Sequence, residues 1–484
     1  MRVRRDKRAG MLAEGKQPYP LGLKRTASLK DVRDKHDGLA AGESTGEVVS
    51  VAGRVMFMRN TGKLCFATLR EGDGVELQVM LSLAKVGEEA LADWKRLADI
   101  GDHVGVTGEV VASKRGELSV MVDEWAMAAK ALRPLPVAHK PLGEETRVRQ
   151  RYVDMIMRPR ARDNVRDRAA AVRAVRDMLH DDGFVEVETP MLQVMPGGGA
   201  ARPFLTRSNA LDIDLYLRIA LELYLKRCVV GGVEKVFEIG RNFRNEGIDS
   251  SHSPEFTMLE AYAAYGDYRS IARLTSDLVR GAAQRVFGST HVTHVDGLEM
   301  ELGGQWREIT MFGSLSEALG EEVAVTTPYE TLVSFADKVD LSVDPVWNAG
   351  QLAEELFEHL VVDSLVEPTF VFDYPEETSP LTAAHRDTPG LAEKWDLYVR
   401  GVELGTGYSE LVDPIVQRER FEQQVRQAAK GDEEAMRMDE DFLRAMEYGL
   451  PPMGGMGMGI DRMLMALTGQ GIRETIIFPF VKPE

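Results

Sequence analysis

Residues 46–130 contain five short segments in which apolar and polar side chains alternate. They are 47–57, 64–70, 75–81, 103–111 and 117–125, and a stretch with helical spacing, 87–98, follows the third. Alternation with a period of two predicts half-buried β-strands, and Gly and Asp residues between several segments mark turns. The pattern therefore predicts a small all-β domain with one helix.

The order of these elements is typical of an OB-type barrel. Such barrels bind single-stranded nucleic acid on one face, by base stacking and backbone contacts. A barrel with a purely structural role is the alternative. Residues 1–45 precede it as an N-terminal helical extension, which contains more Lys and Arg than Asp and Glu.

The chain beyond the barrel begins with a proline-rich linker, residues 131–146. Helical spacing then relates Val165, Ala169, Val172, Val175 and Leu179. Many later segments alternate without regular βαβ spacing, which favours an antiparallel sheet. We expect an α+β domain over 147–484, an antiparallel sheet flanked by helices, with residues 270–360 mainly helical.

Composition narrows the class of protein. The 484 residues are 44% hydrophobic and carry a net charge of −18, so a protein that coats nucleic acid by bulk charge is excluded. No run approaches 18 apolar residues, so we expect no membrane span. The two cysteines, Cys65 and Cys228, form no CxxC pair, which favours a reducing, cytoplasmic setting and no thiolate metal site.

Residues 241–262 predict a strand, a polar loop and a returning strand. Side chains alternate faces along a strand, which pairs Arg244 with Glu246 and places on one face Phe256, Met258, Glu260 and Tyr262. A guanidinium, carboxylates and an aromatic ring suit a ligand that is both anionic and planar. A cross-strand Arg–Glu ion pair is the alternative.

Residues 403–410 also predict a strand, on which Thr406, Tyr408 and Glu410 share a face. Glu403 has the opposite parity, and only a bulge at Gly405 or Gly407 would turn it to that face. Asp396 and Glu403 together offer hard oxygen ligands to Mg²⁺, and solvated surface carboxylates are the alternative.

Two further segments complete the set. Residues 184–190, from Phe184 to Pro190, predict a strand that the proline ends. Residues 454–459 alternate Gly and Met before a helix whose first turn contains Arg462, where the helix N-terminus and the guanidinium both favour an anion. The spacing differs from GxGxxG, so a dinucleotide fingerprint is rejected.

Taken together these segments resemble motifs 1, 2 and 3 of the class II aminoacyl-tRNA synthetases, in the right order. Among these the chain is most similar to class IIb lysyl-tRNA synthetases of the bacterial type. The resemblance covers nearly the whole chain and is weakest over 270–360. It rests on residues 196–204, 215–227, 236–247, 252–262, 407–411 and 447–462, and on 4–12 with the barrel.

The resemblance implies that lysine reacts with ATP to form lysyl-adenylate and pyrophosphate, and that the lysyl group then passes to the 3′ end of tRNA(Lys). It implies catalytic roles for Arg244, at the lysine carboxylate and the α-phosphate, and for Arg462, at the γ-phosphate. Phe256 is expected to stack on adenine. Glu246 and His252 are expected to hold the nucleotide, with a surface histidine as the alternative for His252.

The family also implies a lysine pocket, a metal site and an anticodon site. The lysine-binding set is Glu222, Arg244, Glu260, Tyr262, Thr406, Tyr408 and Glu410. The Mg²⁺ ligands are Asp396 and Glu403, and Glu403 also belongs to the ATP site. Phe66 is expected to stack an anticodon base while Gln78 and Glu117 bond base edges, and a core role is the alternative for Phe66.

Four residues depart from the pattern common among bacterial members. Thr406 replaces Asn, Tyr408 replaces Phe, Asp396 replaces Glu and Ser253 replaces Asn. None removes a charge that the mechanism requires, but the shorter Asp396 leaves the number of metal ions open.

Rival interpretations are an aspartyl or asparaginyl class IIb enzyme, a paralogue that lysylates a protein, and a non-catalytic RNA-binding or regulatory paralogue. The resemblance also implies a homodimer that pairs through residues 184–190.

Overall fold

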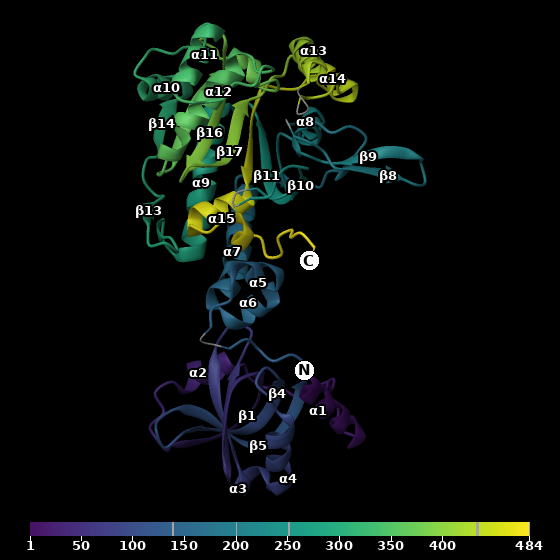
Figure 1. Ribbon diagram of the computed structural model, residues 1–484, viewed down its shortest axis with the longest axis vertical. Helices are drawn as coiled ribbons and strands as arrows, with labels where there is room; N and C mark the ends of the chain where they lie inside the picture. Colours follow the sequence, from purple (N-terminus) through teal and green to yellow (C-terminus); the bar gives the residue numbers. More distant parts are fainter. Residues whose placement is uncertain (138–139, 200, 250–251, 432–434, 484) are drawn as a thin grey trace. The chain divides into compact units, whose positions relative to one another are not determined.

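The computed structural model describes residues 1–484 except 138–139, 200, 250–251, 432–434 and 484. The chain divides into two compact units, Met1–Arg162 and Asp163–Glu484 (Figure 1). The predicted linker, 131–146, lies within the first unit. None of the helices in the described part of the chain is both long enough and apolar enough to span a membrane.

The first unit contains a closed five-stranded barrel with the strand order β1-β2-β3-β5-β4. Its strands are β1 (Ser44–Thr61), β2 (Leu64–Arg70), β3 (Glu76–Ser82), β4 (His103–Ala112) and β5 (Leu118–Ala129). Neighbouring strands are antiparallel except β3 and β5, which are parallel. The five strands predicted from alternation are thereby confirmed.

The first unit also contains six helices among its described residues. They are α1 (Arg2–Ala13), α2 (Leu29–His36), α3 (Leu83–Val86), α4 (Glu88–Leu97), α5 (Glu144–Arg149) and α6 (Arg151–Met157). Met11 of α1, Leu29 and Val32 of α2 and Trp94 of α4 belong to the same buried cluster as the inward-facing strand residues. The N-terminal extension is therefore part of the barrel's hydrophobic core.

The second unit is built on an eight-stranded sheet with the order β14-β15-β16-β17-β18-β11-β10-β6. Its strands are β6 (Val185–Glu186), β10 (Lys235–Phe243), β11 (Glu255–Ala264), β14 (Arg307–Thr310), β15 (Thr369–Pro375), β16 (Leu391–Val399), β17 (Val402–Ser409) and β18 (Met453–Gly459). Only the two outermost pairs, β14–β15 and β6–β10, are parallel. The predicted antiparallel sheet is confirmed.

The strand predicted over 184–190 is wrong in length. Only Val185 and Glu186 form strand β6, beside Val236 and Phe237 of β10. Beyond it Thr189 leaves the ladder, because its backbone N–H and its hydroxyl both donate to Glu238 Oε2, at 3.0 and 2.6 Å. The side-chain acceptor replaces the backbone carbonyl that a longer strand would need.

Three helices cover one face of this sheet. They are α7 (Pro159–Asp181), α9 (Tyr268–Phe287) and α15 (Ile460–Thr468). Their apolar side chains share a buried cluster with alternate residues of the central strands, among them Phe237, Leu259, Trp395 and Met456. The helical spacing predicted around Val175 and Leu179 is confirmed by α7.

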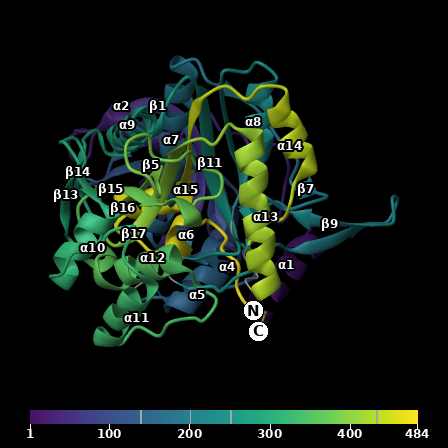
Figure 2. The same cartoon turned by 90° about the horizontal axis from the view of Figure 1, so that it is seen from above.

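Other elements flank the opposite face of the sheet. On one side stand α10 (Met311–Leu319), α11 (Tyr329–Lys338) and α12 (Ala349–Leu360), with the short 3₁₀ turns η1 (Val362–Ser364) and η2 (Glu376–Thr378). On the other side stand α8 (Glu222–Val230), α13 (Pro414–Lys430) and α14 (Glu440–Glu447), which lie together in Figure 2. The remaining helix is α16 (Ile472–Thr475).

Residues 270–360 are mainly helical as predicted, with short strands between the helices. These are β12 (His291–Thr293), β13 (Glu299–Glu301) and β14. A separate three-stranded sheet contains β7 (Leu192–Gln193), β8 (Leu205–Ser208) and β9 (Ile213–Leu217). Its β8–β9 hairpin projects from the second unit in both views (Figures 1 and 2).

Strand β18 explains the Gly–Met alternation near the C-terminus. Met456 and Met458 point into the core cluster, whereas Gly455 and Gly457 pair with Tyr262 and Glu260 of β11 on the opposite face. The prediction of a glycine-rich approach to a ligand is therefore refined. Because the glycines of this central strand carry no side chain, side chains from neighbouring segments can lie over this face of the strand.

Gly407 provides a test of this packing. A Cβ there would overlap the Trp395 ring on the neighbouring strand. We expect Gly407→Ala to lower the free energy of unfolding by about 1–3 kcal/mol, because an extra methyl group in a packed core forces shifts. Gly304→Ala, where a Cβ would meet open space, should change it by less than about 0.5 kcal/mol. Urea denaturation of both variants measures the difference, and equal effects would contradict the packing argument.

Candidate functional site

The face of the sheet away from α7, α9 and α15 carries polar side chains in two rows. Register places Glu238, Glu260, Gly457, Thr406 and Asp396 side by side across five strands. The next row is Tyr262, Gly455, Tyr408 and Lys394. Because each strand alternates faces, the residues between them form the core on the opposite side. The rows form one polar face of the sheet, called the cleft below, with Gly455 and Gly457 at its centre, and its residues Tyr408 and Lys394 also line a cavity.

A β-bulge turns Glu403 toward this face. Leu397 pairs with Gly405 and Tyr398 pairs with Glu403, so Leu404 is an extra residue on β17. The shift reverses the parity of the residues before it. Glu403 thus shares the face of Tyr398, Asp396 and Thr406, and the bulge that the sequence left open is present at Gly405.

One end of the cleft contains three buried carboxylates. Glu222 is 5% exposed, Glu260 4% and Glu410 3%. Lys226, fully buried, places Nζ 2.5 Å from Glu222 Oε1 and 2.5 Å from Glu410 Oε2. Glu260 accepts hydrogen bonds from the Leu221 backbone N–H, at 3.0 Å, and from the Tyr262 hydroxyl, at 3.1 Å. The structure brings the three glutamates and Tyr262 together.

Burial raises the pKa of each of these carboxyl groups. Burial is the largest cause in each case, and it raises the pKa of Glu260 to about 7 and that of Glu410 to about 8. The pKa of Glu222 also lies above its usual range, although Lys226 opposes the shift. A second cation at this end of the cleft would stabilise the ionised carboxylates.

Lys226 is the residue that sequence reasoning missed here. It lies within the segment 215–227 that carries the family resemblance, one helical turn after Glu222 on α8. That i,i+4 spacing was the available signal. Its second partner, Glu410, lies 184 positions further along the chain, and only the fold brings the two together.

The middle of the cleft contains Arg244 and Phe256. The Arg244 backbone N–H donates to the Pro254 carbonyl at 2.9 Å, which extends the β10–β11 register past the end of β10. Its guanidinium carbon lies 5.3 Å from the Phe256 ring centre. Arg244 Nε is buried without a hydrogen-bond partner among the described residues. A cation and a ring that share one face are the geometry predicted for an anionic, planar ligand.

Arg462 is the second arginine of the predicted site. It lies in the first turn of α15, as predicted, and Nη1 donates to the Glu403 carbonyl at 2.9 Å. Its Nη2 is 3.4 Å from His252 Nε2, and His252 Nδ1 is 2.8 Å from Asp249 Oδ2. His252 therefore connects the predicted ATP-site residues across two motifs. Glu246 is exposed in the loop after β10.

The predicted metal ligands lie on neighbouring strands. Asp396 is 5% exposed, its Oδ2 lies 3.1 Å from Lys394 Nζ, and its Oδ1 has no hydrogen-bond partner among the described residues. Glu403 Oε2 lies 3.9 Å from Arg462 Nη1. The described residues contain no group of three or more side chains that would hold a metal ion by themselves. Two carboxylates on one face fit Mg²⁺ that takes its other ligands from substrate phosphates and water.

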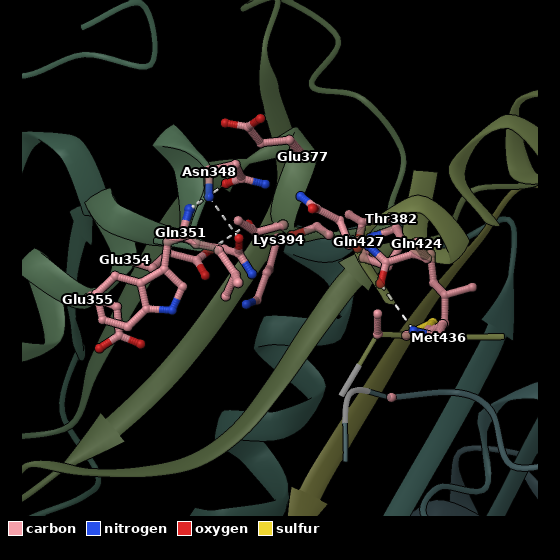
Figure 3. A pocket seen from close by; sticks show the side chains of 18 of the residues that line it. Asn348, Gln351, Glu354, Glu355, Glu377, Thr382, Lys394, Gln424, Gln427 and Met436 are labelled. Atoms are coloured by element: carbon pink, nitrogen blue, oxygen red, sulfur yellow. Dashed lines mark hydrogen bonds between the residues drawn. The ribbon is translucent and has the colours of Figure 1, made fainter. Parts of the chain in front are cut away.

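A cavity of about 680 Å³ adjoins this region. It is lined by Glu222 and Tyr408 of the acidic end and by Glu354, Glu355 and Glu358 of α12. Figure 3 shows Glu354 and Glu355 on this helix. Burial raises the pKa of Glu358 to about 7, and neighbouring carboxylates add to the shift. The cavity beside the acidic end of the cleft is therefore also lined by carboxylates, from α12.

In the first unit, Phe66 lies on the outside of the barrel. Cys65, Ala67 and Leu69 point into the core, so the alternative core role for Phe66 is wrong. Arg59, its partner on β1, lies 5.1 Å from the ring centre. Phe57, which the sequence analysis missed, shares this face and is 54% exposed.

The other two predicted anticodon residues border this outer face. Gln78 pairs with Thr68 of β2, and its Nε2 donates to Ser119 Oγ at 2.8 Å. Glu117, just before β5, is exposed and forms an ion pair with Arg33 at 3.2 Å. Two aromatic rings beside amide and carboxylate groups make a surface suited to single-stranded nucleic acid.

Comparison with known proteins decides the family. The profile described as "tRNA synthetases class II (D, K and N)" matches residues 143–482, and an "OB-fold nucleic acid binding domain" profile matches residues 49–128. The chain belongs to the class II tRNA synthetases. Both halves of the predicted fold class, the OB-type barrel and the synthetase domain, are confirmed.

Several curated relatives of this class II synthetase match it over its full length. A lysine–tRNA ligase of Kineococcus radiotolerans is 63% identical, with 100% of this chain and 97% of the relative covered. One of Mycolicibacterium gilvum is 59% identical, with 99% and 96% covered. The lysine–tRNA ligase 1 of Mycobacterium tuberculosis is 58% identical, with 100% and 97% covered.

Hydrogen bonds among Arg168, Thr257 and Asp461 connect motif 3 of this synthetase to its motif 2 strand, β11. Asp461, which precedes Arg462, is 1% exposed and accepts from Arg168 Nη1 at 2.5 Å and from the Thr257 backbone N–H at 2.8 Å. Arg168 Nη2 also donates to Thr257 Oγ1 at 2.8 Å. Arg462 and Phe256, each adjacent to a bridged residue, are thereby kept in a fixed relation.

We expect Asp461→Ala to destabilise the second unit by about 3–5 kcal/mol, because it leaves the Arg168 guanidinium, only 14% exposed, without its carboxylate partner. Asp182→Ala, which breaks the exposed Lys235–Asp182 pair, should change stability by less than about 1 kcal/mol. Thermal and urea unfolding of the two variants measure the difference. An unchanged free energy of unfolding in Asp461→Ala would show that the Arg168–Asp461 bridge does not stabilise the fold.

Proposed function

We propose that this protein is a lysine–tRNA ligase. It activates L-lysine with ATP to give lysyl-adenylate and pyrophosphate, then transfers the lysyl group to the 3′ end of tRNA(Lys). The observation that carries the proposal is the acidic end of the cleft, where three buried carboxylates face one buried ammonium. A substrate ammonium supplies a second positive charge there, and charge-assisted hydrogen bonds of this kind are stronger than neutral ones.

The acidic end also argues against the other substrates of the same family. An aspartate substrate would place a fourth carboxylate among Glu222, Glu260 and Glu410. Lys226, the cation in contact with this set, already pairs with two of them. An asparagine side chain would bring no second positive charge to the three buried carboxylates, which is unfavourable.

Lysine binds, in this proposal, with its ε-ammonium among the three glutamates and its carboxylate at Arg244. Tyr262, Thr406 and Tyr408 line the path between the two ends. The Thr406 hydroxyl donates to the Trp395 carbonyl at 3.2 Å, so the Thr that stands where many relatives have Asn is held in place by its neighbouring strand.

ATP lies with its adenine on Phe256 and its phosphates between Arg244 and Arg462. His252 and Glu246 border the nucleotide from the loop between β10 and β11. When the lysine carboxylate attacks the α-phosphate, both arginines stabilise the developing negative charge and position the groups, and no side-chain nucleophile is needed. Asp396 and Glu403 would hold Mg²⁺, which would neutralise negative charge on the phosphates.

The barrel is the proposed anticodon-binding surface, with Phe66 as a stacking platform and Gln78 and Glu117 at base edges. We also propose a cytoplasmic homodimer. Its support is a group of exposed apolar side chains in the second unit, around the predicted interface and the projecting hairpin: Val185, Met191, Leu192, Val194, Leu205, Leu211 and Ile213. An apolar patch of this kind is typical of a protein interface.

The test of the proposal is ATP–pyrophosphate exchange with Mg²⁺ and each of the twenty amino acids, without tRNA. We expect exchange with lysine, followed by charging of tRNA(Lys) when it is added. Arg244→Ala should reduce exchange about 10²–10³-fold, because a positioned donor at the reacting phosphate is lost. Arg444→Ala, an exposed arginine on α14, should leave it unchanged.

Exchange with aspartate or asparagine instead would overturn the assignment of the pocket. No exchange with any amino acid, from folded protein that still binds ATP, would favour a non-catalytic role.

Phe66→Ala tests the barrel surface. Loss of one stacked base should weaken binding of the anticodon stem-loop by about 1–3 kcal/mol while lysine-dependent exchange stays unchanged. Val48→Ala, an exposed residue near the other end of β1, is the matched control. Fluorescence anisotropy with a labelled stem-loop measures both, and equal affinities of the two variants would contradict the assignment.

A further inference from the structure

Lys226 is the one ammonium in contact with the glutamates of the proposed lysine pocket, as far as the described residues show. Its side chain is fully buried on α8 and forms ion pairs of 2.5 Å with Glu222 and with Glu410. It also lies 6.0 Å from the Tyr262 ring centre. The lysine therefore joins a carboxylate from a helix to one that follows strand β17.

The remaining bonding capacity of these carboxylates points to a ligand. Glu410 is 3% exposed and its Oε1 has no hydrogen-bond partner among the described residues. A Cβ on Gly455 would overlap both Glu410 Oε1 and the Tyr262 ring, so only glycine leaves room for this arrangement. A buried carboxylate oxygen without a partner is unfavourable unless a donor reaches it.

The charged and titratable groups that face Lys226 and its partners come from α8, β11, β17 and the segment after β17. They are Glu222 on α8, Glu260 and Tyr262 on β11, Tyr408 on β17, and Glu410 just after it. Arg244 lies near enough to influence Glu260, and Arg218 is engaged by Glu238 at 2.7 Å. Among the described residues, Lys226 is the cation that forms ion pairs with Glu222 and Glu410.

We propose that Lys226 is a positioning residue for lysine recognition: its ammonium keeps Glu222 and Glu410 ionised and holds one oxygen of each, so that their other oxygens are presented to the substrate's ammonium. The inference rests on the proposed function, since it assigns a role within the lysine pocket. It gives a physical reason for a fully buried lysine inside a pocket that binds the same functional group.

This role predicts a specific pH dependence. Lysine binds to ionised carboxylates, and burial raises their pKa values, so affinity falls as pH decreases through those values. Removing the Lys226 ammonium raises the carboxyl pKa values further. The loss of lysine affinity should therefore begin at higher pH in a variant without this charge. The substrate ε-amine, with a pKa of about 10.4, sets the upper limit of the window.

The experiment compares Lys226→Met with the wild type in lysine-dependent ATP–pyrophosphate exchange between pH 6.5 and 9.5. At pH 7.5 we expect KM for lysine to rise about tenfold or more, as a shift of one pKa unit implies. The midpoint of its pH profile should move up by about one unit or more. KM for ATP should stay within about twofold. Lys338→Met, an exposed lysine on α11, is the matched control.

Conservative variants separate charge from packing. Lys226→Arg keeps a cation and should retain the wild-type pH midpoint even where KM changes. Lys226→Gln keeps a donor without charge and should shift the midpoint as Met does. If Lys226→Met shows no cooperative thermal transition, and so does not fold, Lys226→Gln serves as the uncharged variant.

Three results would overturn the inference. They are an unchanged KM for lysine in the folded, uncharged variants, a raised KM with an unshifted midpoint, and an equal shift in Lys226→Arg. Failure of the proposed function is distinguishable, because the wild-type enzyme would then show no lysine-dependent exchange at all.

Discussion

The alternation of side chains along the central strands is the constraint on which the second unit depends. Each strand sends one residue into the core under α7, α9 and α15 and the next into the cleft. The same five strands therefore build the hydrophobic core and position the polar residues of the site. In β18 the alternation becomes Met against Gly, since the core needs volume and the cleft floor needs space.

Buried charge is the second constraint, because ionised groups leave water only where they find partners. Glu238 is satisfied by Arg218 and Thr189, and Asp461 by Arg168 and a backbone N–H. Both oxygens of each of these two carboxylates therefore have donors within the protein. At the acidic end Glu222 and Glu410 share the Lys226 ammonium, whereas Glu260 accepts only from neutral donors among the described residues, and burial raises the pKa of all three carboxyl groups. A cationic ligand would supply the positive charge that this buried set of carboxylates lacks.

Much of this architecture could be predicted from periodicity and motifs. The five barrel strands, helix α7 and the antiparallel sheet follow from spacings of 2 and 3.6 residues, because these spacings reflect burial of one face. Strand alternation grouped Phe256, Glu260 and Tyr262, and the start of a helix singled out Arg462, whereas Glu222, His252 and the specific roles of the site residues came from the family resemblance. The strand predicted over 184–190 is shorter in the structure, because the Thr189 backbone N–H and hydroxyl donate to the Glu238 carboxylate and not to a neighbouring strand.

By itself the sequence determined which segments are strands and helices, the Gly–Met alternation of β18 and the motifs that mark the family. These are local properties, set by neighbours within a few positions. The tertiary structure decided the face of Glu403, through the bulge at Gly405, and the outward face of Phe66. It also decided the pairing of Lys226 with Glu410. Such features depend on register and on contacts between distant segments, where a one-residue shift moves a side chain to the opposite face.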